Sequence, residues 1–381
     1  MKTKEIINQC LKLYMRANKL ENLKYYNQNQ SYATHIYGSM ILAVAINSEF
    51  NITTDIAKVL RILILSNIKQ YNHELYLEEY LGTIPKGKQY LAELSAPNTP
   101  EFALAKQCEE LDEQLYDIIN IPGNEKIAGG TLYELAVKQN IFNPQNENED
   151  RKCQEIFRFY YLNDKLKNKD RSGWDEYHWR LKSNRIEKVS EHIFATLVLA
   201  LVISLELEPN INIDKVLKTL TIHEIGEILI GDLTPFDNVA PEEKKKIEHQ
   251  AIIKVIGDLT EREELINLIF EFDEIETPEA KFEFYCDKIQ ADIKSKIYEE
   301  LGLNFSLAEQ ENNIVLKSNT IKKIIADGAR TVYDVWHEYD KPRYKESNAF
   351  SSLLEKIKET PLTELCSKTE NKKSKIYSPK N

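Results

Sequence analysis

The stretch Asn212–Ile225, NIDKVLKTLTIHEI, shows the pattern that decides the fold. Its apolar residues recur at the i, i+3, i+4 spacing of one helix face, not at the alternating spacing of a strand. The same period runs through Asp55–Ile68, DIAKVLRILILSNI, and through the segment EELINLIFEF. The 381 residues include only 12 glycines and 12 prolines, and no Asn-Gly or Asp-Gly turn lies between alternating residues. We therefore predict an all-α fold.

These two stretches belong to an internal repeat. Asp55–Ile68 matches Asn212–Ile225 at an offset of 157 residues, and Thr34–Ile46 matches Glu191–Ile203 at the same offset. Two further pairs keep the order at offsets of 146 and 178 residues: Asn18–Tyr26 with Asp164–Ser172, and Thr99–Tyr116 with Thr277–Lys294. The sequence thus predicts two tandem copies of one helical unit, the second carrying two insertions.

A polar stretch, NPQNENEDRK at 143–152, is the expected linker between the copies. The predicted domains are then residues 1–142 and residues 153–366, the second including C-terminal helices. The last residues, 367–381, are basic and polar, which is typical of a disordered tail.

The composition is that of a soluble globular protein, with 42% apolar and 29% charged residues. A net charge of −11 argues against general nucleic-acid binding, because phosphate backbones attract basic surfaces, but it allows a single nucleotide in a local pocket. Five scattered cysteines without a C-x-x-C pair indicate reduced thiols.

The N-terminal segment lacks the apolar core of a signal peptide, and the longest apolar run, Ile193–Leu207, is too short to span a bilayer. That run is better interpreted as a buried helix. We therefore expect a cytoplasmic protein without a membrane partner, and the sequence leaves a homodimer open.

Polar groups interrupt the apolar run Thr221–Pro235, TIHEIGEILIGDLTP. We expect one helix from residue 212 or 214 to about residue 230, on which His223, Glu224 and Glu227 project toward one side. A glycine then ends the helix and leaves Asp232 near its C-terminal end. This arrangement favours a chemical site over a solvated helix edge.

His192 lies 31 residues before His223, which suits two antiparallel neighbouring helices, and Asp287 lies on a later helix. Two imidazoles with the carboxylates of Glu224 and Asp287 form a mixed nitrogen and oxygen set that suits one divalent ion such as Mn, Co, Fe, Ni, Zn or Mg. Such an ion lowers the pKa of water and polarises a phosphoryl oxygen. Glu227 is then a candidate to orient or deprotonate water, or to protonate a leaving group.

Each member of this set also has a simpler explanation. A His-Glu pair on a helix is usually solvated surface, and His192 beside an apolar run could be a core histidine. Asp287 could pair with Lys288. The joint pattern favours the site over these alternatives.

With these residues in view, the second copy resembles the HD-domain metal-dependent phosphohydrolase superfamily, and within it the bacterial 5′-deoxynucleotidase-like branch. The resemblance rests on five segments: FYYLNDKLKNKDRSGW at Phe159–Trp174, RIEKVSEHIF at Arg185–Phe194, HEIGEILIGDLTPF at His223–Phe236, EHQAI at Glu248–Ile252 and TPEAKFEFYCDKIQADI at Thr277–Ile293.

The resemblance implies that His192, His223, Glu224 and Asp287 bind the metal. It implies that Glu227 acts on water or the leaving group and that Asp232 serves catalysis and binds the sugar. In the same way Arg185 is expected to contact phosphate, and Trp174 is expected on the substrate side. The sequence departs from the family at Glu224, which stands where the family has aspartate.

The first copy keeps His35 at the position of His192 but has Ser66 and Asn67 where the second has the His-Glu pair. At offset 178, Glu109 stands where the second copy has Asp287. Too few ligands remain for a metal site of this kind. The N-terminal copy is therefore expected to be a degenerate HD-like domain that scaffolds, dimerises or covers the active copy.

The resemblance implies a metal-dependent enzyme that releases phosphate from a nucleotide, foremost a (deoxy)nucleoside 5′-monophosphate. Two alternatives stay open. One is a nucleotide-binding sensor that has lost turnover, and the other is a phosphodiesterase or triphosphohydrolase of another HD type.

Overall fold

The computed structural model describes residues 2–26, 28–50, 54–71, 74–120, 125–138, 147–237 and 239–365. Within these ranges the chain is helical, with three isolated β-bridges and no strand, so the predicted all-α fold is confirmed. The predicted tail at 367–381 and the first part of the predicted linker lie outside the described residues.

The N-terminal half consists of the following helices: α1 (Lys2–Asn18), η1 (Lys19–Glu21), α2 (Tyr32–Phe50), α3 (Ile56–Tyr71), α4 (Glu74–Gly82), α5 (Pro85–Leu94), α6 (Pro100–Ile119) and α7 (Glu125–Lys138). The second half continues with α8 (Glu147–Asp164), η2 (Lys165–Lys167), η3 (Ser172–Trp174), α9 (Val189–Glu206), α10 (Ile213–Ile222), α11 (Glu227–Ile230), α12 (Pro241–Ile256), α13 (Arg262–Glu274) and α14 (Pro278–Glu300). The C-terminal segment adds η4 (Leu307–Glu309), η5 (Val315–Lys317), α15 (Asn319–Ala326), α16 (Val332–Asp340), η6 (Lys341–Tyr344) and α17 (Asn348–Glu359).

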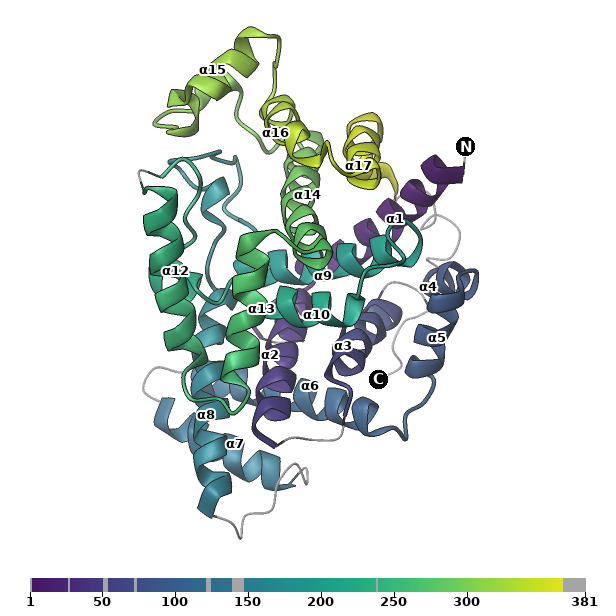
Figure 1. Ribbon diagram of the computed structural model, residues 1–381, viewed down its shortest axis with the longest axis vertical. Coiled ribbons are helices and arrows are strands. Elements are labelled where there is room, and N and C mark those ends of the chain that lie inside the picture. Colours follow the sequence, from purple (N-terminus) through teal and green to yellow (C-terminus); the bar gives the residue numbers. More distant parts are fainter. Residues whose placement is uncertain are drawn as a thin grey trace, which may run out of the picture.

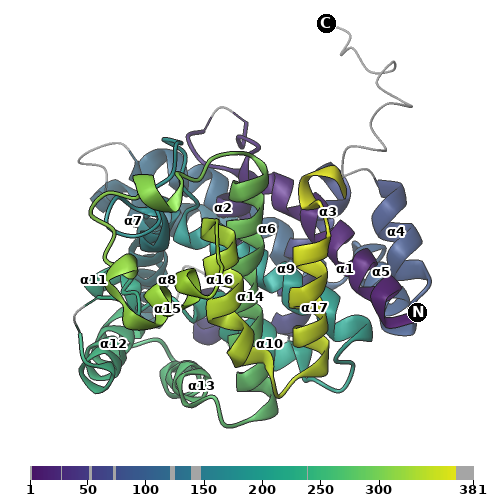
Figure 2. The same ribbon diagram turned by 90° about the horizontal axis from the view of Figure 1, so that it is seen from above.

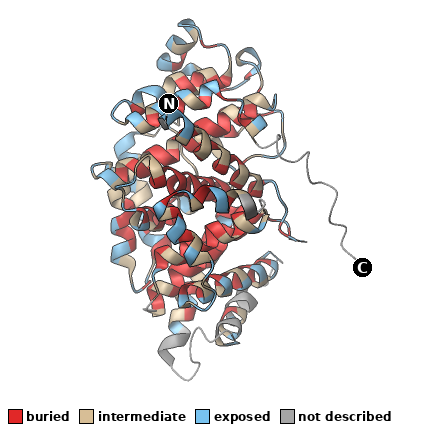
Figure 3. Ribbon diagram, turned by 90° about the vertical axis from the view of Figure 1, so that its right-hand side faces the viewer, coloured by how far each residue is buried: buried red, intermediate tan, exposed pale blue. Residues whose placement is uncertain are grey.

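Helix α9 lies at the centre of the molecule, and α1, α2, α10 and α14 pack around it (Figure 1). It begins where the Glu191 carboxylate accepts a hydrogen bond from the Lys188 backbone N–H at 2.8 Å, which satisfies a free helix-start donor. By length and composition α9 could cross a membrane, but 94% of it is buried inside the protein. It is therefore the core helix that the apolar run predicts. Figure 3 shows that buried residues fill the interior of the molecule.

The C-terminal helices cover one face of α14. Helices α16 and α17 both pack along α14 (Figure 2), and α15 packs on α16. Helix α14 begins at Pro278, where the Thr277 hydroxyl accepts a hydrogen bond from the Ala280 backbone N–H. This layer supplies the outer wall of a cavity beside α14.

The predicted offsets recur in the helix boundaries. Helices α2 and α9 begin 157 residues apart, and so do α3 and α10. The bridge between Lys24 and Ser31 has its counterpart between Asp170 and Lys188, at offsets of 146 and 157. These coincidences support the repeat, because loops of unrelated origin have no reason to pair at the same two offsets.

The two halves pack against each other around one shared hydrophobic core. Helix α1 packs on α9, and α8 in turn packs on α2. The boundary between domains differs from the predicted linker in one respect, because residues 147–152 belong to helix α8. A helix of this length that packs on α2 is a structural element and not a spacer.

The prediction of one continuous helix up to residue 230 is wrong. Helix α10 ends at Ile222, and residues 223–226 form a turn before α11. The His223 Nδ1 atom lies 2.8 Å from the Leu220 carbonyl, the oxygen that a continuing helix would use, so the side chain competes with the backbone for it. Glycine at position 226 allows the turn to lie close to α12, because a Cβ would lie 3.3 Å from Ile252 Cγ1, and Ile252 would have to shift slightly.

Candidate active site

The loop between α8 and α9 folds back toward the start of α9. The Arg171 N–H donates to the Glu187 carbonyl at 2.9 Å, and the Val189 N–H donates to the Lys169 carbonyl at 2.9 Å. These two bonds bring the Arg171 side chain to the turn that carries the His-Glu pair, 53 residues further along the chain.

The four predicted metal ligands come together. One ligand atom from each of His192, His223, Glu224 and Asp287 lies within 4.8 Å of all the others. Glu224 Oε1 lies 3.6 Å from Nε2 of each histidine. Two atoms bound at about 2.1 Å to the same ion lie at most about 4.2 Å apart, so the set is only slightly wider than one ion requires.

The hydrogen-bond state of both histidines fits a metal ligand. His223 Nδ1 donates to the Leu220 carbonyl, which leaves its buried Nε2 without a partner among the described residues. His192 Nδ1 lies 2.6 Å from Gln290 Oε1, and its Nε2 faces Asp287 Oδ1 at 2.8 Å. Nδ1 therefore has a partner in Gln290, and Nε2 is the nitrogen that faces Asp287 and Glu224 in the cluster.

Burial lowers the pKa of His223, so its imidazole is neutral at pH 7 and free to bind a metal. Burial alone would raise the pKa of Asp287, but Lys288, at 2.6 Å from Asp287 Oδ2, and His192 lower it well below the usual range. The longer side chain of Glu224 still reaches the cluster. With glutamate in place of aspartate, a carboxylate oxygen still lies within the cluster at this position.

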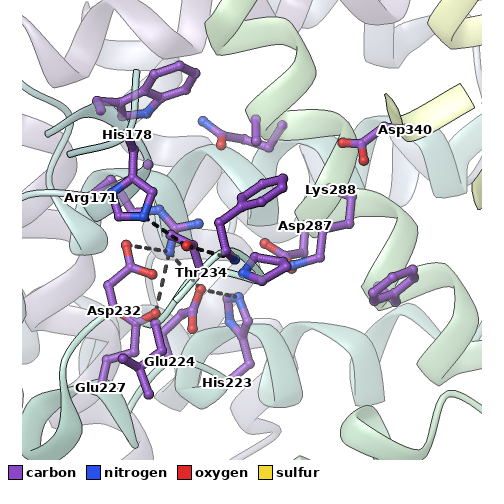
Figure 4. A pocket seen from close by; sticks show the side chains of 18 of the residues that line it. Arg171, His178, His223, Glu224, Glu227, Asp232, Thr234, Asp287, Lys288 and Asp340 are labelled. Atoms are coloured by element: carbon purple, nitrogen blue, oxygen red, sulfur yellow. Dashed lines mark hydrogen bonds and ion pairs between the residues drawn. The ribbon is translucent and has the colours of Figure 1, made fainter. Parts of the chain in front are cut away.

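A second group of carboxylates surrounds one guanidinium. Arg171 Nη1 lies 3.1 Å from Glu224, 3.6 Å from Glu227 and 3.5 Å from Asp232. In Figure 4 these side chains gather on the side of the cavity next to His223. Asp232 also accepts a hydrogen bond from the Ser172 backbone N–H at 2.9 Å. The arginine thereby links Glu224, a predicted metal ligand, to the two predicted catalytic carboxyl groups.

The two catalytic candidates have opposite proton affinities. Burial would raise the pKa of Asp232, but Arg171 outweighs it and lowers the pKa to about 2. Burial raises the pKa of Glu227 well above its ordinary value, and the nearby Asp232 and Glu224 raise it further. A carboxyl group that keeps its proton beside one that does not is the arrangement of a general acid with an anionic partner.

These groups line a cavity of about 320 Å³. Its polar side holds His223, Glu224, Asp287 and the carboxylates around Arg171, and tryptophan side chains also line it. His192 is fully buried and is not part of the lining. Trp174 stacks on Trp336 of α16, with ring centroids 5.0 Å apart and an interplanar angle of 27°. The Trp336 Nε1–H is buried without a hydrogen-bond partner among the described residues. Trp174 thus lies where the sequence predicts it, and Trp336 is a lining residue that the sequence did not reveal.

Arg185 is the predicted substrate-binding residue that the structure does not bring to the cavity. Its guanidinium pairs with Glu191 at 2.8 Å and donates to the Glu21 carbonyl at 2.6 Å. It is absent from the cavity lining, where Arg171 stands instead. The signal that could have identified Arg171 is its place in the lead-in segment, three residues before Trp174.

In the N-terminal half, the residues at the positions of the predicted metal ligands form hydrogen bonds with neighbouring side chains. The Asn67 amide donates to Glu109 at 2.6 Å, and His35 Nδ1 lies 2.8 Å from Asp112 Oδ2. Lys167 from the second half pairs with Asp112 at 2.5 Å. The part of the chain that the structure describes holds no second group of metal-competent side chains like the one around His192.

Residues 163–325 match the HD domain family. The chain is similar to the 5′-deoxynucleotidase hdd1 of Schizosaccharomyces pombe, with 32% identity over 132 residues, which cover 33% of this chain and 63% of that protein. It is also similar to the 5′-deoxynucleotidase HDDC2 of Danio rerio, with 31% identity over 148 residues, and of Homo sapiens, with 30% identity over 148 residues. These alignments cover 38% of this chain and 70% and 69% of those proteins.

Among solved structures, the PH0347 protein of Pyrococcus horikoshii OT3 aligns with 51% of this chain and 98% of its own, at 23% identity and a TM-score of 0.33. The family match covers the fold-back loop, both histidines, Glu224 and Asp287, which are the residues that the structure gathers into one cluster. By this match and by its identity to the Danio rerio protein, the chain belongs to the HD-domain family.

Proposed function

We propose that the protein is a metal-dependent phosphohydrolase that releases phosphate from a nucleoside 5′-monophosphate, preferably a deoxynucleotide. One observation carries the proposal: a cluster fit for a divalent ion and a guanidinium share one cavity with a stacked aromatic pair. The names of the similar proteins agree with this substrate class.

The cavity supports a mononucleotide. Its volume of about 320 Å³ lies at the lower end of the range for small-molecule sites, which favours a monophosphate over a larger ligand. A base fits against the tryptophan side chains of the lining because aromatic faces stack on every nucleobase. The phosphate then lies toward Arg171, whose planar fork suits phosphate oxygens.

His192, His223, Glu224 and Asp287 would hold the ion. A divalent ion at this place supplies Lewis acidity to the phosphoryl group and lowers the pKa of water. Arg171 orients the phosphate and balances its charge. Glu227 is the group that supplies the proton that the leaving 5′-oxygen requires, because burial and its neighbours raise its pKa well above the ordinary value and so favour its protonated form. Asp232, held anionic by Arg171, accepts hydrogen bonds from the sugar side.

The test is phosphate release from a panel of 5′-monophosphates, with the matching 3′-monophosphates and triphosphates as comparisons. Each substrate is assayed with Mn²⁺, Co²⁺, Zn²⁺ and Mg²⁺ after removal of metal by a chelator. We expect release from 5′-monophosphates that depends on added metal and is lost in His223→Gln. Bound metal without release from any monophosphate would refute the proposal, and nucleotide binding without turnover would favour a sensor.

A further inference from the structure

The wall of the cavity that the C-terminal helices supply lies outside the HD domain match, which ends at residue 325. The side chains of α16 that line the cavity include Trp336, Tyr339 and Asp340, and Arg343 of η6, which follows α16 directly, lines it too. The last three are three, four and seven positions after the tryptophan, so all four lie on one face of a continuous helical segment. This face is a feature of the C-terminal segment and not of the matched domain.

The guanidinium of Arg343 is held in place from three sides. Its Nε–H donates to Asp340 Oδ1 at 2.5 Å. Its central carbon lies 5.3 Å from the ring centroid of Tyr339 and 5.9 Å from that of Phe284, within the distance at which a cation is attracted to an aromatic face. The Asp340 side chain is only 4% exposed, so the carboxylate that orients the guanidinium is itself fixed by packing.

The terminal nitrogens of Arg343 remain available to a ligand. Among the residues that the structure describes, only Asp340 accepts a hydrogen bond from the guanidinium, and it takes the Nε–H. The two Nη groups carry four further N–H donors in one plane, and 26% of the side chain is exposed. Because Arg343 lines the cavity, these donors form a flat fork that a bound molecule can reach.

This fork lies apart from the expected position of the phosphate. In Figure 4 Asp340, the partner of Arg343, lies on the other side of the site from Arg171 and Asp232. The proposed function places the phosphate at the metal cluster and Arg171. A nucleotide that binds in this way has its phosphate engaged there, so the group left for Arg343 belongs to the other end of the nucleotide, which is the base.

A guanidinium fork binds best to two adjacent hydrogen-bond acceptors. Among the nucleobases guanine offers such a pair, at O6 and N7, and adenine places an amino group beside N7 instead. Cytosine presents an amino group at the corresponding edge, and thymine presents one oxygen beside a methyl group. The aromatic side chains of Trp336 and Tyr339 on the same helix face suit the stacking of a base.

We propose that Arg343, oriented by Asp340, selects guanine, so that the preferred substrate is a guanine nucleotide. The inference rests on the proposed function, because it names the base of the substrate that the same site takes. Arg343 determines specificity through a direct contact with the base. Asp340 is a positioning residue, since it acts through the guanidinium.

The experiment measures kcat/KM of the full chain for dGMP, dIMP, 7-deaza-dGMP and dAMP, with the metal that supports turnover best. We expect dGMP to be preferred over dAMP by about 5- to 150-fold, the range for a bidentate contact against the wrong base. Most of the difference should lie in KM, because the base is remote from the reacting phosphate. We expect dIMP, which keeps O6 and N7, to resemble dGMP, and 7-deaza-dGMP, which lacks N7, to fall between dGMP and dAMP.

Three variants assign the preference to the fork. Arg343→Met should lower kcat/KM for dGMP to the level for dAMP. Arg343→Lys keeps the charge but not the planar pair of donors, so it should also lose most of the preference. Lys341→Met is the matched control and should keep it. Lys341 is a cation of the same helical turn, pairs with Glu355 of α17 at 3.2 Å and does not line the cavity.

Equal kcat/KM for dGMP and dAMP in the wild type would overturn the inference and leave the proposed function standing. A preference that persists in both Arg343 variants, or that is lost equally in Lys341→Met, would also overturn it. Titration calorimetry of the same nucleotides with the metal-free protein measures the base contact without turnover. Tighter binding of dGMP than of dAMP that is lost in Arg343→Met, without hydrolysis under any metal, contradicts the proposed function and supports this inference.

Discussion

Replacing Arg171 with methionine separates the role of the guanidinium from that of the metal. Arg171 is the cation that Glu224, Glu227 and Asp232 share, at 3.1 to 3.6 Å. In Arg171→Met these carboxylates face one another without it. We expect a lower free energy of unfolding in the metal-free protein and a large loss of turnover. Metal binding should be at least as tight as in the wild type, because the cation that repels the metal ion is gone.

The structure sets the size of each effect. The pKa of Asp232 is about 2, against an ordinary value of 3.8, and Arg171 is the foremost cause of the lowering. That difference is worth on the order of 2 kcal/mol of folding free energy, at about 1.4 kcal/mol per pKa unit. A depressed carboxyl pKa contributes stability that is present at neutral pH and lost as the pH falls through about 2, so the variant is weakened at pH 7. A charged hydrogen bond to phosphate is worth about 1.5–3 kcal/mol, which corresponds to about a 10- to 150-fold loss in kcat/KM.

Three measurements check this prediction: urea unfolding without metal, Mn²⁺ titration, and kcat/KM for a deoxynucleoside 5′-monophosphate. The control is Arg185→Met, which removes an arginine that points away from the cavity, and its kcat/KM should stay within about threefold of the wild type. A large loss in Arg185→Met with little change in Arg171→Met would refute the assignment of the phosphate contact to Arg171. Weaker Mn²⁺ binding in Arg171→Met would refute the electrostatic reasoning.

Three other substitutions test single residues. Glu227→Gln should lower kcat by about 100-fold and abolish the alkaline fall of kcat in a pH profile, since the raised pKa makes the protonated form active and the rate declines as the pH rises through it. Trp336→Ala should raise KM for nucleotides about 10-fold with little change in kcat, as measured by steady-state kinetics, because a base stack is worth about 1–3 kcal/mol. The buried Glu283 has its pKa raised to about 8 by burial, so its contribution to stability is complete below pH 4.5 and falls as the pH rises toward 8. Glu283→Gln should therefore stabilise the protein at pH 8, by a few kcal/mol at most, but not at pH 4, and thermal unfolding at the two pH values checks this.

The sequence was sufficient where chemistry and helix spacing coincide. His192, His223, Glu224 and Asp287 could be predicted together because ordered motifs on three helices point to one cluster, which the structure gathers within 4.8 Å. The repeat added a control, since the first copy keeps the apolar frame of the same helix without the His-Glu pair. The all-α class followed from periodicity alone.

The features that the sequence did not predict depend on tertiary contacts, which the spacing of residues along the chain does not encode. The break after Ile222 follows from a side-chain bond between His223 and the Leu220 carbonyl, while the apolar period continues unchanged through residue 230. Arg171 reaches the site because its loop folds back on the start of α9, and a nearer arginine, Arg185, was the natural choice in the sequence. Trp336 lies beyond every motif and reaches the cavity only through the packing of α16 on α14.

The ion pairs between the two halves have a consequence for how the sequences of the halves can diverge. Glu21 and Lys167 occupy equivalent positions, 146 residues apart, and each crosses to the opposite half, Glu21 to Lys294 and Lys167 to Asp112. If the two halves were identical subunits of a homodimer, the two positions would hold the same residue, and every substitution would appear in both halves. A single chain allows opposite charges at the two places, so one half can lose its chemistry and specialise as a partner while the other keeps it.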